Sequence, residues 1–497
     1  MDMLRAAAAL LAIAILVGCT VTPSAPPSVD PPASTAPAAA ASAASGASVT
    51  PAATSPDLSA RPLIWFAPLP PMPTDAGRPF IGSEDFMDLF ADERSWDTAS
   101  DRIGVFKLYG EWVAYHATDA ELRAAVEEIA RRRLVLAVEM GPLDPPPECG
   151  EGVESFAGID EGQLISRRIR QAGGTLQVIA LDEPYYFAHV YDGPNACRWS
   201  VDRVAQAVAG FRDAMRAEWP AIVIGDIEPM PHPVSDAGLA AWLDAYRAAA
   251  GEPFAFLHLD VDWSRGDWPL LGVAVEAAGR ERGVPIGMIY NGGAATSDEQ
   301  WLALAGRRVQ AYETDAGARP DDVIFQSWMD KPDHALPETD PASFTSFINR
   351  YVDDPGSLGD LTGGADNLAQ GAKVTASSAV VDAPPERTID GDPDTLWTAG
   401  AGPPAWIEID LGAEHAVAEV RLMVAQSPPG PTHHRVGCRA AASGATTVLG
   451  DVQQPTADAE VLVIRPASPV TCRYVRVETS MSPSWVAWRE IEVVAGD

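Results

Sequence analysis

Carboxylates recur at the ends of short apolar runs in the middle of the chain, in a pattern that suits acid–base chemistry. Asp182 and Glu183 are adjacent and precede Pro184, and further acids follow comparable runs: Glu111, Glu139, Asp226, Glu228, Asp260 and Asp262. A protonated acid beside a leaving oxygen, opposite an ionised carboxylate, cleaves a carbon–oxygen bond by general acid–base catalysis. Crowding carboxylates in a partly apolar site raises the pKa of at least one of them, which keeps an acid protonated.

Other catalytic chemistries have less support in the sequence. It contains no G-x-S-x-G, H-E-x-x-H, G-x-G-x-x-G or Walker motif. Lys107 could form a Schiff base if it were desolvated, but an ion pair with Glu111, on the same face of one strand, is the simpler expectation. His258, Asp260 and Asp262 alternate along another strand and could bind a metal, but no flanking pattern supports one. We therefore expect catalysis without a cofactor.

The elements that position these acids follow a strand–helix alternation between about Arg61 and Asp354. The β-branched or aromatic runs are Leu63–Leu69, Ile103–Trp112, Leu134–Met140, Leu176–Glu183, Ile222–Glu228, Phe254–Trp263, Ile286–Asn291 and Val323–Trp328. Amphipathic helical patterns such as Asp119–Arg133 and Val201–Trp219 lie between them. Eight such pairs predict a TIM-type (β/α)8 barrel over residues 61–356, with a doubly wound open sheet as the alternative.

Side-chain alternation predicts which residues of each strand face the barrel mouth. In Phe256–Trp263 the polar residues His258, Asp260 and Asp262 alternate with apolar ones. Because helices must cover the apolar face, we expect the polar face to point into the mouth, where barrel active sites lie. The expected substrate contacts are Tyr109, Glu111, Glu139, Asp226, His258, Tyr290, Asn291 and Trp328. A lone histidine such as His258 is more typical of a hydrogen-bonded core residue.

The Asp182-Glu183-Pro184 tripeptide resembles the Asn-Glu-Pro that ends the fourth strand in many retaining glycoside hydrolases of the large barrel clan. The resemblance implies that Glu183 is the acid/base and Asp182 its substrate-orienting neighbour. An adjacent Asp-Glu also resembles hexosaminidases that use the substrate's acetamide as nucleophile. The clan's nucleophile is a Glu ending strand seven, whereas this strand ends in Tyr290-Asn291. Either Glu228, Asp260 or Asp262 supplies the second carboxylate, or the mechanism is inverting or substrate-assisted, or the barrel only binds.

The C-terminal region has strands and turns with few helical stretches. Its order of segments is Val374–Ser378, Asp390–Trp397, Trp406–Gly412, Val417–Leu422, Tyr474–Glu478 and Trp488–Val493. This order resembles the coagulation factor 5/8 type C, or discoidin, domain and related carbohydrate-binding modules. The resemblance implies an all-β jelly-roll sandwich over residues 366–497 and a carbohydrate partner. It also implies a structural Ca²⁺ held by Asp390, Asp392, Thr395 and Glu490, with a metal-free Asx turn as the alternative. Trp485 and His433–His434 are candidate loop contacts.

The first residues predict export. The apolar run from Ala6 to Val17 is too short to span a bilayer, and Leu16-Val17-Gly18-Cys19 resembles a bacterial lipobox. The resemblance implies a signal peptide over residues 1–18 and a lipid on Cys19, which anchors an extracytoplasmic protein to the cell membrane. Residues 19–60 are rich in Pro, Ala, Ser and Thr and predict a disordered tether.

The other four cysteines then lie in an oxidising setting, where the economical pairing of the three that are open is Cys149 with Cys197 and Cys438 with Cys472. The Gly-rich residues 357–365 predict a linker with few contacts.

The net negative charge of the chain excludes some classes of binding partner. The chain has 69 acidic against 35 basic residues, a net charge of −34. Such a surface repels nucleic acid and anionic lipid, so the lipid anchor is the only membrane contact we expect. The sequence thus favours a surface-anchored glycoside hydrolase that acts on a glycan. The alternatives are a noncatalytic glycan-binding or adhesion lipoprotein and, with the least support, a Lys107-dependent lyase. Neither the sugar nor the linkage follows from the sequence.

Overall fold

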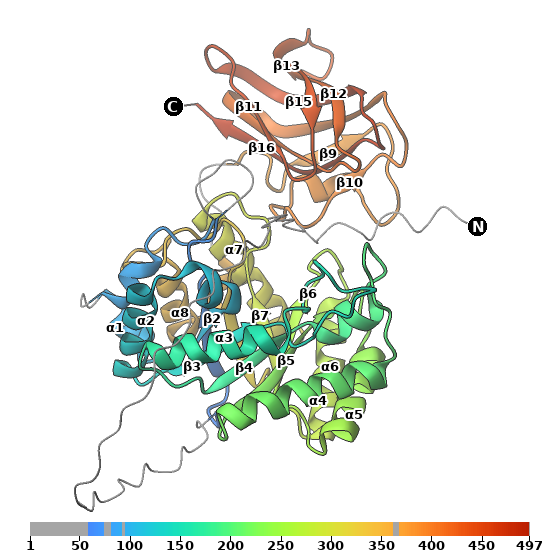
Figure 1. Cartoon of the computed structure of the whole chain (residues 1–497). Coiled ribbons are helices and arrows are strands. Elements are labelled where there is room, and N and C mark those ends of the chain that lie inside the picture. Colours follow the sequence, from blue (N-terminus) through green and yellow to red (C-terminus); the bar gives the residue numbers. More distant parts are fainter. Residues whose placement is uncertain (1–57, 74–80, 92–94, 361–366, 497) are drawn as a thin grey trace, which may run out of the picture.

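The computed structural model describes residues 58–73, 81–91, 95–360 and 367–496, which form two folded units (Figure 1). The expected signal peptide, Cys19 and nearly all of the expected tether lie outside the described residues. Leu58 already packs against the apolar residues inside the first unit, so the folded part begins slightly before Arg61. No helix in the described part of the chain is long and apolar enough to cross a membrane.

The first unit is a closed barrel of eight parallel strands, as predicted. The strands are β1 (Leu63–Ala67), β2 (Val105–Tyr109), β3 (Val135–Met140), β4 (Val178–Asp182), β5 (Val223–Met230), β6 (Leu257–Val261), β7 (Ile286–Tyr290) and β8 (Asp322–Gln326). β1 closes the barrel against β8, with Leu63 opposite Asp322 and Ala67 opposite Gln326. The carboxyl ends of all eight strands therefore meet at one end, which we call the mouth.

Helices surround the barrel (Figure 1). They are α1 (Asp97–Ser100), α2 (Asp119–Arg131), α3 (Gly158–Gln171), α4 (Val201–Glu218), α5 (Asp236–Ala250), α6 (Trp268–Arg282), α7 (Asp298–Val309) and α8 (Phe344–Asp353). Local signals fix their ends. Thr118 and Glu121 form a capping box at the start of α2, and Gly251 takes a left-handed conformation at the end of α5.

Two apolar layers support the strands. The barrel interior is filled by Leu63, Trp65, Val105, Ala137, Val178, Ala180, Ile227, Phe256, Ile289 and Ile324. The alternate strand residues, such as Ile224, Leu257 and Met288, pack outward in a second cluster with the helices. Residues that end a strand on the inward face therefore lie above a packed apolar floor.

The second unit is an antiparallel β-sandwich, as predicted. Its strands are β9 (Lys373–Ala376), β10 (Trp397–Thr398), β11 (Ala405–Val424), β12 (Gly430–Arg439), β13 (Thr447–Thr456), β14 (Val461–Ile464), β15 (Val470–Met481) and β16 (Ala487–Ala495). The runs Trp406–Gly412 and Val417–Leu422 are one continuous strand, β11, whose pairing with β15 shifts between Asp410 and His415. The Cys438–Cys472 disulfide joins β12 to β15, as expected.

Helix α7 carries a contact between the two units. Arg307 donates hydrogen bonds to the backbone carbonyls of Asp390 and Gly391, at 3.1 and 3.0 Å. Arg308 is nearly buried and donates to a carboxylate oxygen of Asp394 at 2.7 Å. The expected linker starts inside the barrel unit, because Leu358 is fully buried in its core. The expectation of few contacts is wrong for this part, and residues 361–366 lie outside the described ranges.

Candidate active site

Carboxylates from several strand ends gather at the mouth. Glu139 lies near the carboxyl end of β3, and Asp260 lies on β6. Asp182 is the last residue of β4, and Glu183 follows it directly. Each remains partly exposed, so a ligand in the mouth can reach it. Lys107 of β2 is fully buried beside them, where it pairs with Glu139 and donates to Gln326 Oε1 at 2.6 Å. The expected ion pair between Lys107 and Glu111 is therefore wrong.

Burial and mutual repulsion hold protons on this cluster. Burial raises the pKa of both Asp182 and Glu183 well above the ordinary range, and neighbouring carboxylates, Asp260 among them, add to the rise. Burial, with the charges of Glu139 and Glu154, raises the pKa of Asp260 to about 7. Glu183 donates a side-chain hydrogen bond to Asp260. The two side chains are thus hydrogen-bonded neighbours, and burial raises the pKa of both.

The backbone at Glu183 is strained. Its φ of +49° lies in the left-handed region, which costs a non-glycine residue on the order of 1–3 kcal/mol. Glu183 N bonds to the carbonyl of Ile227 at 3.2 Å. Buried Glu228 accepts the backbone N–H groups of Tyr185 and Tyr186 at 2.7 and 3.0 Å. These bonds and Pro184 fix the turn, so that Glu183 is held at the mouth in a conformation that it would not adopt alone.

The prediction that Asp226 and Glu228 face the mouth is wrong. Asp226 lies on the outer side of β5 and accepts a hydrogen bond from Trp242 Nε1 of α5 at 2.6 Å. Ile227, between the two acids, packs inside the barrel. Gly225 also faces inward, and a Cβ there would lie 2.3 Å from the ring of Phe256. β5 therefore carries its acids on the helix side, contrary to the assumption that every polar strand face points inward.

Other expected site residues also lie elsewhere. His258 is fully buried below the mouth, with Nε2 3.1 Å from Asp322 Oδ2, and burial lowers its pKa. Asp262 accepts hydrogen bonds from the backbone N–H and hydroxyl of Ser264 and so fixes its own turn. The alternative in which His258, Asp260 and Asp262 bind a metal together is therefore not supported. Its histidine is a core residue, as the simpler interpretation predicted.

At the ends of β7 and β2, expected substrate contacts form hydrogen bonds within the protein instead. Tyr290 points outward from β7 and donates to Glu313 Oε1 at 2.9 Å. Asn291 Oδ1 accepts from Trp263 Nε1 at 3.1 Å and from Arg308 at 3.0 Å. Glu111 lies in the turn after β2, where it pairs with His116. None of these three contacts supports the expected substrate role.

Aromatic groups line the same end of the barrel. Tyr109 lies among Glu139, Asp182 and Asp260 and donates to the carbonyl of Ser327 at 2.6 Å. Trp328 packs on the barrel interior from above. Tyr186, in the π-helical turn Tyr186–Val190, is partly exposed, and burial together with the Glu183 charge raises its pKa to about 12. Tyr109, Glu139 and Trp328 are thus placed where the sequence predicted.

Glu154 is a member of the site that sequence reasoning missed. It lies in the loop between β3 and α3, and its charge acts on Asp182, Glu183 and Asp260. Desolvation, with a smaller contribution from Glu139, raises its pKa to about 7, although its side chain keeps contact with solvent. Strand-end patterns cannot find a loop residue, and the signal that was available is Cys149, which predicts a pinned loop at the mouth.

The turn Asp390–Thr395 of the sandwich brings oxygen atoms together. Thr395 Oγ1 lies 2.9 Å from Asp390 Oδ2 and 3.2 Å from the carbonyls of Arg387 and Asp392. Glu490 is buried nearby, and its Oε2 has no hydrogen-bond partner among the described residues. Burial raises the pKa of Asp390 to about 6 and that of Glu490 well above its ordinary value. An orphaned carboxylate oxygen beside converging oxygens fits a Ca²⁺ ligand set.

A separate cluster of possible metal ligands lies near the start of α7. Asp298, Asp333 and His334 are close enough to share an ion. Lys331 and His334 already pair with the two aspartates, with Lys331 Nζ 3.4 Å from Asp298 Oδ1. Because the Lys331 ammonium already pairs with both aspartates, a charge network is the simpler description.

Comparison with known proteins assigns the second unit. Residues 373–491 match the F5/8 type C domain. Similar solved structures include the family 32 CBM from C. perfringens NanJ in complex with galactose, at 16% identity over 24% of this chain and 91% of that chain, with a TM-score of 0.22. Another is chitosan-binding module 2 of a chitosanase/glucanase from Paenibacillus sp. IK-5 with chitotriose, at 22% identity over 26% and 100% of the two chains, with a TM-score of 0.23. None of the curated proteins compared with the chain matches it.

Proposed function

We infer that the barrel hydrolyses a glycosidic bond and that Glu183 is its general acid. The observation that carries this proposal is the hydrogen-bonded Glu183–Asp260 pair at the mouth, above an apolar floor. Burial raises the pKa of Glu183 well above its ordinary value, which favours the protonated form that an acid at a leaving oxygen needs. The strained turn at Glu183 adds support, because strain is retained where the surrounding bonds enforce it.

The other mouth residues have supporting roles in this proposal. Asp182 lies beside Glu183 and is placed to accept hydrogen bonds from sugar hydroxyls. The faces of Tyr186 and Trp328 offer apolar surface to sugar rings. Glu228 acts as a positioning residue, since it holds the backbone that follows Glu183. Strand β7 supplies no carboxylate, which favours a second candidate function, a barrel that binds glycans without cleaving them.

The sandwich is proposed to bind carbohydrate and one Ca²⁺. Trp485, in the loop between β15 and β16, is 58% exposed, and an exposed indole is a good stacking surface for a sugar ring. His434 is buried against Trp488, so it is not available for the loop contact with a sugar that the sequence predicted. Asp390, Asp392, Thr395 and Glu490 would hold the cation, whose charge would relieve the repulsion among three acids. The lipid on Cys19 would tether both units to the cell membrane.

The decisive experiment is a screen of the full chain on a glycan and aryl-glycoside panel, followed by Glu183→Gln on the best substrate. The variant keeps the shape and removes the transferable proton, so we expect at least about a 10²-fold loss of kcat with binding retained. Activated aryl glycosides, whose leaving groups need no proton, should lose far less. Glu111→Gln, outside the mouth cluster, is the matched control. Binding without any cleavage would establish the noncatalytic alternative instead.

A further inference from the structure

The proposed hydrolysis needs a second carboxylate across the substrate. Of the strand-end acids at the mouth, Glu139 is paired with Lys107, and Asp182 directly precedes Glu183 in the chain. Asp226 and Glu228 lie behind the barrel wall, and Asp262 holds its own turn. Asp260 is in hydrogen-bond contact with Glu183. Catalytic pairs stand about 5–5.5 Å apart in retaining enzymes and about 6.5–9.5 Å apart in inverting ones, so Asp260 is too close to accommodate a sugar between the two.

Glu154 remains as the carboxylate that approaches from outside the strands. It belongs to the loop after β3, whereas Glu183 belongs to the turn after β4. Glu154 is exposed, and its charge acts on both Asp182 and Glu183. An exposed carboxylate on a different loop from the acid can approach a bound sugar from another side.

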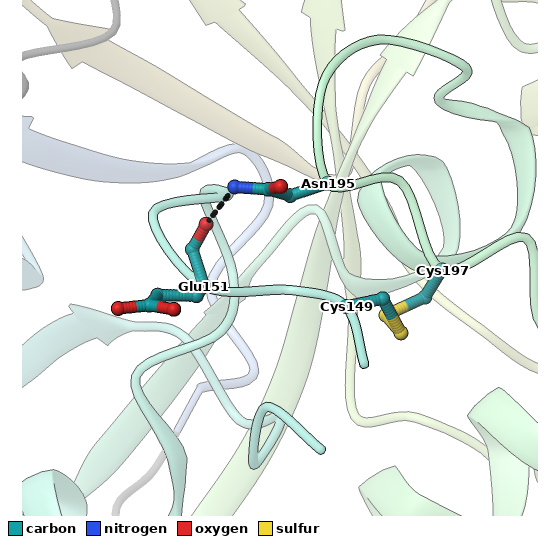
Figure 2. The surroundings of a disulfide bond; sticks show 4 residues. All are labelled: Cys149, Glu151, Asn195 and Cys197. Atoms are coloured by element: carbon teal, nitrogen blue, oxygen red, sulfur yellow. Dashed lines mark hydrogen bonds between the residues drawn. A yellow bond between two sulfur atoms is a disulfide. The ribbon is translucent and has the colours of Figure 1, made fainter. Parts of the chain in front are cut away.

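The loop that carries Glu154 is clamped to the loop after β4 (Figure 2). The Cys149–Cys197 disulfide joins the two loops, as the sequence predicted. Gly150 N donates to the carbonyl of Asn195 at 2.8 Å, and Asn195 Nδ2 donates to the carbonyl of Glu151 at 2.8 Å. Three links thus fix the residues just before Glu154 to the segment that follows the catalytic turn.

The residues on either side of Glu154 are also fixed. Val153 is buried, and its N–H bonds to the carbonyl of Gly150 at 3.1 Å. Ser155 is buried at a φ of +71°, and its carbonyl accepts the N–H of Leu143 at 3.0 Å. A non-glycine residue in that region is strained, so the loop is held in one shape rather than left to fluctuate.

We propose that Glu154 is the second catalytic carboxylate and that the Cys149–Cys197 clamp positions it. The inference rests on the proposed glycoside hydrolysis. Ionised Glu154 removes a proton from a water molecule, whose oxygen forms a bond to the anomeric carbon as the bond to the leaving oxygen breaks. Glu183 gives its proton to that leaving oxygen, which departs as an alcohol. One water is consumed, and the anomeric configuration is inverted.

The test uses the full chain and the best substrate of the same panel. Glu154→Gln should lower kcat/KM at least about 10²-fold, whereas Glu148→Gln, at an exposed residue of the same loop, should keep it within about twofold. NMR of the first product should show the inverted anomer. Loss of the clamp in Cys149→Ser/Cys197→Ser should lower activity and cause no further loss when Glu154→Gln is already present.

A pH profile separates positioning from general damage. Activity should rise with pH as Glu154 ionises near pH 7. Release of the loop into solvent should lower the apparent pKa of this rise toward the ordinary pKa of a glutamate side chain. If the double serine variant does not fold, Asn195→Ala removes one link and keeps the disulfide. A wild type that cleaves nothing defeats the proposed function itself. A wild type that cleaves, with Glu154→Gln at full rate or a retained anomer, overturns this inference alone.

Discussion

Asp260→Asn should stabilise the barrel at neutral and alkaline pH while it removes the partner of Glu183. The folded state raises the pKa of Asp260 from 3.8 to about 7, so the folded protein binds this proton more tightly than the unfolded chain does. Such a group lowers the free energy of unfolding as pH rises from about 4 to about 7. At 1.36 kcal/mol per pH unit the full effect is about 4 kcal/mol. Solvent reaches the side chain, and screening reduces our expectation to about 2 kcal/mol.

The assay is urea denaturation of wild type and variant at several pH values between 4 and 8.5, followed by tryptophan fluorescence. We expect the difference in unfolding free energy to be near zero at pH 4 and to grow to about 2 kcal/mol above pH 7. Asp262→Asn is the control, because this carboxylate, in the turn just after β6, bonds only to Ser264 of that turn. If the unfolding free energies of wild type and Asp260→Asn changed with pH in the same way, the claim that ionised Asp260 destabilises the folded barrel would be refuted.

Three further predictions concern the anchor and the sandwich. Cys19→Ser should release the chain from membranes into the soluble fraction, and unchanged fractionation would exclude lipidation as the anchor. Ca²⁺ at 100 times its Kd should raise the unfolding free energy of the sandwich by about 2.7 kcal/mol, and Glu490→Gln should abolish most of that gain in a calorimetric scan with and without chelator. Trp485→Ala should weaken binding of the best-bound glycan of the panel at least tenfold by titration calorimetry without changing the melting temperature; unaltered affinity would place the sugar elsewhere.

Most of the architecture could be predicted because local patterns determine it. Strand–helix alternation predicted all eight barrel strands, and the adjacency of Asp182, Glu183 and Pro184 predicted where β4 ends. The disulfide pairs followed from domain boundaries alone. The strands β12, β13 and β14 were not predicted. The first two have polar sequences without regular apolar alternation, and β14 is only four residues long.

The errors in the site share one cause. A polar residue on a buried strand can find its hydrogen-bond partners either inside the barrel mouth or on the outer face, under the helices. From the sequence we expected acids to avoid the helix-covered face. Asp226 lies on that face and is satisfied by the indole of Trp242, while Glu228 is satisfied by two backbone N–H groups. Both partners are distant in sequence, so no local pattern could reveal them.

The inward face of β5 explains why its acids had to lie outside. Phe256 fills the barrel at this level, and its ring leaves no room for a side chain at position 225, so that glycine faces inward there. Once Gly225 and Ile227 face inward, strand periodicity sends Asp226 and Glu228 to the opposite side. From there Glu228 reaches the backbone after Glu183 and fixes its strained turn. The steric demand of one aromatic ring thus moves two acids out of the mouth and makes one of them a support for the residue that we propose as the acid.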